Sequence, residues 1–256
     1  MLLVLVAATL LAAAAVFLAP DRVEQVFDRL LPPAPEEIAE SPPAPDSETY
    51  EALKESLAHW RERLAADYHA APGGAERRVV LDDARTVLET TLPAMMRCWL
   101  GTPWDFNGIA SGPGEEGIAC GYFVSTVLRD AGFRVHRYHL AQQPSGNIMR
   151  TFLPRASCKL TVGMDYDEFA DALEASDPGI YIVGLDTHVG FLVVGGDGVF
   201  RFIHSSGSRP WAVVDEPRED ARVLAASNWR MLGHLTADRE VVRKWLAGKV
   251  FPVHGR

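Results

Sequence analysis

The sequence predicts an α+β fold in which a cysteine-bearing helix packs on an antiparallel sheet, with extra helices at the N-terminal side. Apolar residues recur every three or four positions in several segments before residue 175, which is the spacing of amphipathic helices. After the turn at Asp177-Pro178-Gly179 the pattern changes to short apolar runs separated by tight turns, which is typical of antiparallel strands. Helices and strands are thus mostly segregated along the chain, as in α+β proteins.

Composition and charge exclude several classes of protein. The chain has 256 residues, of which 48% are hydrophobic, enough for one sizeable core with appendages. A formal net charge of -9 and the absence of any basic run argue against a nucleic-acid partner. The 3 cysteines contain no CxxC pair, so neither a disulfide framework nor a zinc site is indicated. We expect no metal and no organic cofactor.

Residues 1–19 form a continuous apolar segment at the N-terminus. As a helix rising ~1.5 Å per residue it would span ~28 Å, close to the apolar thickness of a bilayer. A cleaved signal peptide and an uncleaved membrane anchor are both compatible with it. The lack of a basic residue before the apolar core favours the anchor. In either case the protein is expected to be exported, either anchored in a membrane or free in the periplasm or outside the cell.

Two further segments precede the main domain. Residues 20–46 are rich in proline and acidic residues, so they are predicted to form an extended linker without a core of its own. Residues 47–99 are predicted as a helical extension. Its first helix covers Ser47–Ala70, with Ser47 and Thr49 as capping residues, and its second helix is expected to end or kink at Pro93.

The remaining domain, residues 100–256, contains a cysteine at a predicted helix start. A turn-rich, aromatic stretch begins at Gly101, helical periodicity follows Cys120, and Gly132 occupies the position of a C-cap. Unpaired N–H groups and the helix dipole lower the pKa of a thiol at such a position, and the same N–H groups can bind the oxyanion of acyl transfer. The alternative interpretation is a small buried cysteine that only packs the helix start.

Two histidines flank a predicted hairpin downstream. His188 begins one strand, His204 ends the next, and the turn between them is Gly195-Gly196-Asp197-Gly198, so antiparallel pairing would bring the two side chains together. A thiol hydrolase needs a cysteine, a histidine that takes its proton and a polar group that orients the imidazole. The alternative is a pair of half-buried strand histidines with ordinary hydrogen-bond partners.

The region between these motifs is harder to interpret. It covers residues 133–160. His136 and His139 have the spacing of metal ligands on a helix, but without a third ligand they are better explained as surface histidines. The other predicted elements are helices over Val162–Ala175 and Thr236–Leu246, and strands over Ile180–Leu185, His188–Val194 and Val199–Ser205 and within Val223–Leu235.

Two composite motifs accompany the cysteine and the histidines. The first is GTPWDFNG (101–108) followed by ACGYFV (119–124), and the second is HVGFL (188–192) followed by FIHSS (202–206). Over residues 100–206 the chain thereby resembles the NlpC/P60 cysteine peptidases, which are papain-like enzymes that cut bacterial cell-wall peptides. Their motifs read approximately G-x-P-Y-x-W-G-G with D-C-S-G-hydrophobic-V, and H-V-G-I-Y with a hydrophobic-I-H-A/S segment.

The resemblance implies a papain-like NlpC/P60-type fold and a residue-by-residue assignment. Cys120 would be the nucleophile, His188 the general base and His204 the group that orients His188. The implied partner is a peptide or amide substrate, with peptidoglycan among the candidates.

The first motif departs from the family pattern. The family Asp before the cysteine is Ala119 here, the following Ser is Gly121, and the family Tyr is Trp104. The interval from Cys120 to His188 is also longer than the family pattern, which implies that residues 133–160 are an insertion beside the cleft. In the family the two polar residues help to recognise a free amine, which Ala119 and Gly121 cannot do. We expect Trp104, Phe106 and Tyr122 to contribute aromatic faces to the substrate site, so that a free amine beside the scissile bond is not required.

Two other classes of function are compatible with these residues. One is an inactive binding module of the same fold, and the other is an anchored scaffold that uses the linker and the first helices. A papain-like hydrolase or acyltransferase acting on a non-wall amide or ester is a further alternative. In an oxidising compartment, Cys98 and Cys158 are expected to pair and to leave Cys120 as a free thiol.

Overall fold

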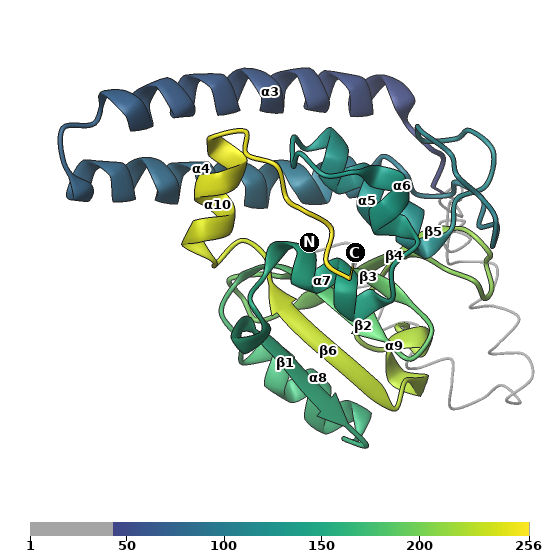
Figure 1. Ribbon diagram of the computed structural model, residues 1–256. Helices are drawn as coiled ribbons and strands as arrows, with labels where there is room; N and C mark the ends of the chain where they lie inside the picture. Colours follow the sequence, from purple (N-terminus) through teal and green to yellow (C-terminus); the bar gives the residue numbers. More distant parts are fainter. Residues whose placement is uncertain (1–42, 256) are drawn as a thin grey trace, which may run out of the picture. The chain divides into compact units, whose positions relative to one another are not determined.

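The computed structural model describes residues 43–255, and from Pro43 onward these residues form one compact unit (Figure 1). The predictions for residues 1–19 and for most of the linker lie outside the described residues. Within the described part, no helix combines the length and the apolar character needed to span a bilayer. The compact unit therefore starts inside the range predicted as linker, and its first residues pack near Gly101 and Gly114.

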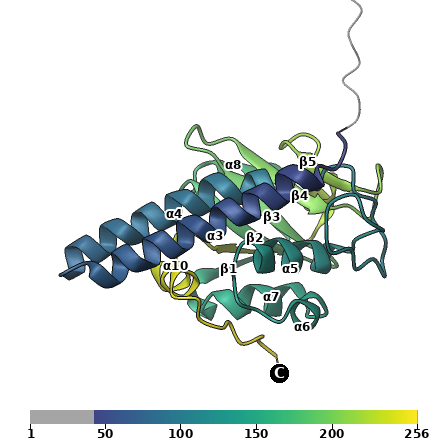
Figure 2. The ribbon, with the colours of Figure 1, turned by 90° about the horizontal axis from the view of Figure 1, so that it is seen from above.

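Two long antiparallel helices open the unit and lie side by side (Figure 2). They are α3 (Ser47–Ala70) and α4 (Gly74–Arg97). The predicted capping residues of α3 were wrong, because Asp46 is the N-cap and its carboxylate accepts a hydrogen bond from the N–H of Thr49 at 2.9 Å.

Pro93 does not end α4, in contrast to the prediction. The helix continues through it to Arg97. Proline removes one helical hydrogen bond, but Leu92, Pro93, Met95 and Met96 are all buried in the core. Burial of apolar side chains contributes on the order of 1.5–3 kcal/mol each, which offsets the lost bond.

The sheet is antiparallel, as predicted, and has the strand order β1-β6-β2-β3-β4-β5. The strands are β1 (Cys158–Val162), β2 (Gly179–Leu185), β3 (Val189–Val194), β4 (Phe200–Ser205), β5 (Val213–Glu216) and β6 (Trp229–His234). Strands β3, β4 and β6 lie within predicted segments, and β2 begins one residue before the predicted Ile180–Leu185. Strands β1 and β5, which form the two edges, were not predicted.

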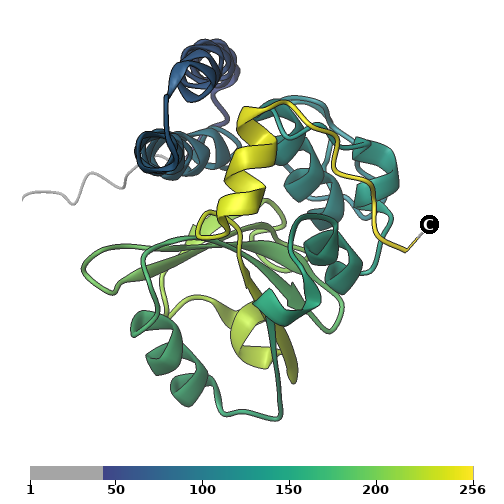
Figure 3. The same ribbon diagram turned by 60° about the vertical axis from the view of Figure 1, so that its left-hand side comes forward.

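Helices cover both faces of the sheet (Figure 3). One face carries α5 (Cys120–Asp130), α6 (Arg137–Ala141), α7 (Ser145–Phe152) and α10 (Arg239–Leu246), and the other carries α8 (Tyr166–Glu174) and α9 (Arg222–Ala226); a single 3₁₀ turn, Arg155–Ser157, precedes β1. Strand β2 contributes side chains to the hydrophobic cores on both faces of the sheet. Ile180 and Ile182 belong to the core that contains α5, and Tyr181 and Val183 belong to the core that contains α8. The α+β class is therefore confirmed.

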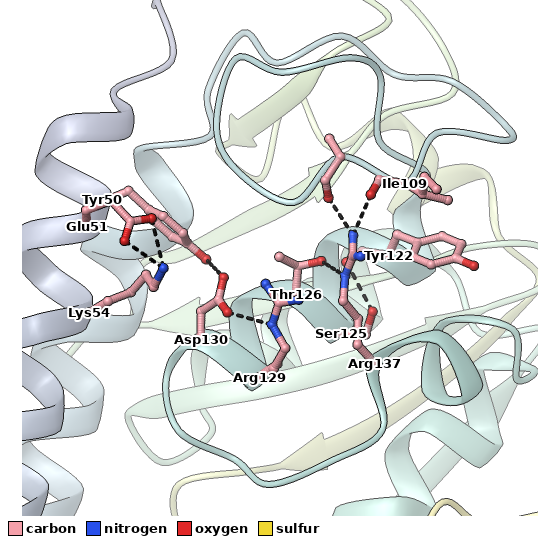
Figure 4. Close-up of polar contacts among 11 residues, drawn as sticks. Tyr50, Glu51, Lys54, Ile109, Tyr122, Ser125, Thr126, Arg129, Asp130 and Arg137 are labelled. Atoms are coloured by element: carbon pink, nitrogen blue, oxygen red, sulfur yellow. Dashed lines mark hydrogen bonds and ion pairs between the residues drawn. The ribbon is translucent and has the colours of Figure 1, made fainter.

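The two long helices share the core of the cysteine-bearing helix. Aromatic edge-to-face contacts run from Tyr50 to Trp99, then to Phe123 on α5 and to Phe191 on β3, with ring centroids 5.6, 6.0 and 6.0 Å apart. The hydroxyl of Tyr50 also donates to Asp130 at 3.0 Å, at the end of α5 (Figure 4). Helix α5 is thus fixed between the helical pair and the sheet.

Candidate active site

Cys120 is the first residue of α5, as the sequence predicted. The N-cap, Ala119, provides no side-chain hydrogen bond, so the first N–H groups of the helix are not capped by a side chain. The backbone before the cysteine is tied down on both sides. Ser205 at the end of β4 donates its hydroxyl to the carbonyl of Ile118 at 2.6 Å, and the N–H of Ala119 donates to Gly108 at 3.0 Å.

A buried arginine joins the loop before Cys120 to α5 and α6 (Figure 4). Arg137 donates to the carbonyl of Ile109 and to the hydroxyl of Thr126, both at 2.7 Å, and also to the carbonyl of Ala110. Its guanidinium lies 5.2 and 5.1 Å from the ring centroids of Tyr122 and Tyr138. Because arginine presents several donors in a fixed plane, this contact set holds the loop rigidly.

The two predicted histidines meet at the hairpin. The Nε2 atom of His188 lies 2.7 Å from Nδ1 of His204, which is completely buried. The other nitrogen of His204, Nε2, lies 3.0 Å from Oε2 of Glu216 on β5. The ring of Phe202 stacks on His204 at 4.0 Å and reaches the edge of His188. The structure therefore joins His188, His204 and Glu216 in one hydrogen-bonded row.

Glu216 was not recognised from the sequence. It ends a four-residue strand whose pattern, VVDE, gives no periodic signal. It reaches His204 because β5 pairs with β4 in a register that places Glu216 opposite Phe202 and Val214 opposite His204. Diagonal neighbours on one face of a sheet are within reach of long side chains.

The backbone N–H groups of Val189, Gly121 and Cys120 lie close enough to the thiol of Cys120 to act on its pKa, each of them in the lowering direction. Among the described residues, no hydrogen bond joins Cys120 to His188. The ring nitrogen of His188 that remains for proton transfer is Nδ1, since Nε2 faces His204.

Burial dominates the electrostatics of the site. It raises the pKa of the Cys120 thiol despite the opposing backbone N–H groups. Burial, together with His204, lowers the pKa of His188 to about 3, and burial lowers that of His204 to about 3. The prediction of a lowered thiol pKa was therefore wrong in direction, because desolvation of the thiolate exceeds the effect of the helix start. At rest the thiol and both imidazoles are neutral.

Cys120 and His188 line the same cavity, which has a volume of about 740 Å³. The cavity follows one end of the sheet, from the start of β3 at Val189 past the end of β2 and the start of β6 to the end of β1 at Val162. Neighbouring strands lie about 4.8 Å apart, so its length is about 14 Å. Arg150 also lines this cavity, and its Nε is buried without a hydrogen-bond partner.

The region predicted as an insertion supplies much of this wall. Residues Ala141 and Gln143–Ile148, from the end of α6 through the first half of α7, line the cavity opposite Leu185–Val189. His136 instead caps α6 by accepting the N–H of His139 at 3.3 Å, and the two rings stack at 3.5 Å.

The predicted substrate-binding residues are divided by the structure. Gly121 lines the cavity, whereas Trp104, Phe106, Ala119 and Tyr122 are not among its lining residues. Trp104 packs against Trp211 at 5.5 Å, and Phe106 is 77% exposed. The expected aromatic lining next to the cysteine is therefore not formed, because Tyr122 packs against Arg137 and the loop carries the other rings elsewhere.

The three cysteines are all free thiols, so the expected pairing of Cys98 with Cys158 is not formed. Over residues 43–255, no cluster of three or more histidine, cysteine or acidic side chains could hold a metal ion. No family model, no curated protein and no solved structure matches this chain.

Proposed function

We propose that this protein is a thiol hydrolase that cleaves an amide bond with Cys120 as nucleophile, His188 as general base and His204 as the group that orients His188. One observation carries the proposal. His188, whose Nε2 lies 2.7 Å from Nδ1 of His204, lines the same cavity as Cys120 at the start of α5. Nucleophile, base and orienting group are the parts that covalent acyl transfer requires.

The reaction proceeds in two halves. The thiol of Cys120 gives its proton to Nδ1 of His188 as sulfur attacks the carbonyl carbon, and the carbonyl electrons move to oxygen. The first N–H groups of α5 stabilise this oxyanion. The C–N bond then breaks, and the departing amine takes the proton from Nδ1. In the second half, water gives a proton to Nδ1 and attacks the thioester carbon. The C–S bond then breaks, the sulfur takes the proton back from Nδ1 to become the thiol, and the carboxylic acid is released.

The neutral resting pair fits general-base catalysis better than a preformed thiolate–imidazolium pair. A base of low pKa releases its proton readily to the leaving amine, although it accepts the thiol proton less readily. Substrate that fills the cavity and places its carbonyl carbon near the sulfur would favour the transfer by orientation.

The resemblance to NlpC/P60 peptidases supports an exported enzyme with wall peptide among its substrates. The altered residues Ala119 and Gly121 provide neither a carboxylate nor a hydroxyl for an ammonium group. We therefore propose that N-blocked or apolar substrates are accepted at least as well as substrates with a free amine. Arg150, which lines the same cavity, offers a donor to an acidic or carbonyl group of the substrate.

A binding module of the same fold is the second candidate. The observation in its favour is that burial raises the pKa of the Cys120 thiol while burial and the neighbouring His204 lower that of His188, which disfavours a reactive thiolate. Such a module would bind substrate in the same cavity without turnover.

The proposed function is tested by incubating the full chain, in detergent, with wall-derived peptides and with simple N-acyl amides. Products are identified by mass spectrometry, and Cys120→Ala serves as the control. New products that require Cys120 support the hydrolase. Saturable binding without products in both proteins would favour the binding module.

A further inference from the structure

We infer that Glu216 is a positioning residue that decides which nitrogen of His188 carries the proton, and so decides whether His188 can act as a base. The inference rests on the proposed role of His188 and extends it to a residue outside the three assigned positions. It follows from the row of contacts that links β3, β4 and β5.

The row has fixed partners at each position. Nε2 of His188 faces Nδ1 of His204 at 2.7 Å, and Nε2 of His204 faces Oε2 of Glu216 at 3.0 Å. Neither ring nitrogen of His204 can change its partner, because the His204 side chain is completely buried and stacked on Phe202. A neutral imidazole has one donor and one acceptor nitrogen, so the state of one end determines the whole row.

An ionised Glu216 sets the productive arrangement. The carboxylate only accepts, so His204 must donate from Nε2 and accept at Nδ1. His188 must then donate from Nε2, which leaves the lone pair on Nδ1. That lone pair is what the thiol proton of Cys120 requires.

A protonated Glu216 sets the opposite arrangement. Its hydroxyl donates to Nε2 of His204, which then donates from Nδ1 to Nε2 of His188. The proton of His188 is then on Nδ1, and this atom can no longer accept a proton. One added proton at Glu216 thus moves the imidazole protons of both rings from Nε2 to Nδ1, with no imidazolium formed.

The surroundings place this change near neutral pH. Burial, with Asp220 nearby, raises the pKa of Glu216 to about 7, against the weaker effects of Arg222 and Arg201. Arg201 is itself occupied by Asp215, to which it donates at 2.7 Å. Asp215 also accepts from Arg97 at 2.7 Å, so the neighbouring acid rather than Glu216 is neutralised by the arginines.

The inference is tested by ¹⁵N NMR of the full-length Cys120→Ala protein carrying labelled histidine, recorded from pH 5.5 to 8.5. The chain has 8 histidines, and the signals are assigned with His188→Gln and His204→Gln. We expect both imidazoles to be protonated at Nε2 at pH 8.5 and at Nδ1 at pH 5.5, with a midpoint near 7. Tautomers that stay unchanged across this range would overturn the inference.

Two matched variants identify the group that titrates. Glu216→Gln should abolish the midpoint, because the amide does not ionise. Asp220→Asn should keep the change and move its midpoint to lower pH, because a repelling carboxylate is removed. A transition that survives in Glu216→Gln would contradict the inference.

Activity provides an independent reading. In active protein, kcat/KM should fall about tenfold per pH unit below the midpoint, and Glu216→Gln should remove this acid limb whatever its effect on the plateau rate. A tautomer change without any turnover would refute the proposed hydrolase and leave the role of Glu216 intact. Turnover with an acid limb that persists in Glu216→Gln would support the proposed hydrolase and refute the role of Glu216.

Discussion

Gly121, the residue after the candidate nucleophile, packs directly against the backbone of Ala141. A Cβ atom at Gly121 would overlap the carbonyl oxygen of Ala141 at the end of α6. The end of α6 therefore leaves no room for a side chain at the residue that follows Cys120.

Gly121→Ser should therefore destabilise the protein. We expect a loss of about 1–3 kcal/mol in the free energy of unfolding, because a backbone carbonyl cannot move aside cheaply. The control is Gly196→Ser, since a Cβ at Gly196 meets nothing within 4 Å. Urea unfolding of both variants checks the prediction, and equal stabilities would contradict the close contact.

The three candidate catalytic residues should differ in how much activity each one supports. Cys120→Ala and His188→Ala should abolish turnover with the fold intact, because they remove the nucleophile and the base. His204→Ala should leave a reduced, measurable rate, because an orienting group acts through the base. Steady-state kinetics with circular dichroism as the folding control tests this, and full activity of Cys120→Ala would refute the assignment.

The substrate preference should not depend on a free amine. Neither Ala119 nor Gly121 can pair with an ammonium group, so acetylating the N-terminus of a peptide substrate should leave kcat/KM unchanged or raise it. The measurement compares one peptide in its free and acetylated forms. A preference for the free amine of about a hundredfold, or ~2.7 kcal/mol in transition-state binding, would return the protein to the usual wall-peptidase specificity.

The paired histidines, of which His204 is buried and His188 is half-buried, should make the protein less stable in mild acid. The pKa values of His188 and His204 fall from 6.5 in the unfolded chain to about 3 when folded. Between pH 6.5 and 4.5 the unfolded chain therefore binds more protons at these two sites, and the free energy of unfolding falls as the pH falls. Glu216 works in the opposite direction over pH 4.5–7, because its pKa is raised to about 7 in the folded protein.

The two histidines outweigh the one carboxyl group. The net effect of the three groups is that the free energy of unfolding falls by about 1.4 kcal/mol for each unit by which the pH falls in this window. The double variant His188→Gln/His204→Gln should lose clearly less stability than the wild type between pH 6.5 and 4.5. Denaturant unfolding at several pH values measures both slopes. Identical slopes would mean that these imidazoles are not buried in the neutral form.

The sequence was sufficient where local pattern decides the structure. Apolar spacing predicted α5 with Cys120 at its start, and the glycine-rich turn predicted the hairpin that brings His188 to His204. It was insufficient where tertiary contacts decide. Burial reversed the expected pKa shift of Cys120, and packing carried α4 through Pro93.

Short elements were the other source of error. Helices α6 and α7 have 5 and 8 residues, and strand β5 has 4, so each offers too few periods to be recognised. These elements form the cavity wall and position Glu216. The candidate nucleophile and base were therefore predictable from the sequence. The shape of the cleft and the contact of Glu216 with His204 were not.

The central claim is that His188 activates Cys120, and the rate of alkylation of individual thiols tests it most directly. Cys158 is a matched internal control, because it is also half-buried and burial also raises its pKa. With iodoacetamide at pH 7.5 and peptide mapping, we predict that Cys120 reacts at least tenfold faster than Cys158 and that His188→Gln removes this difference. Equal rates in the wild-type protein, or a fast Cys120 that is unaffected by His188→Gln, would contradict the account.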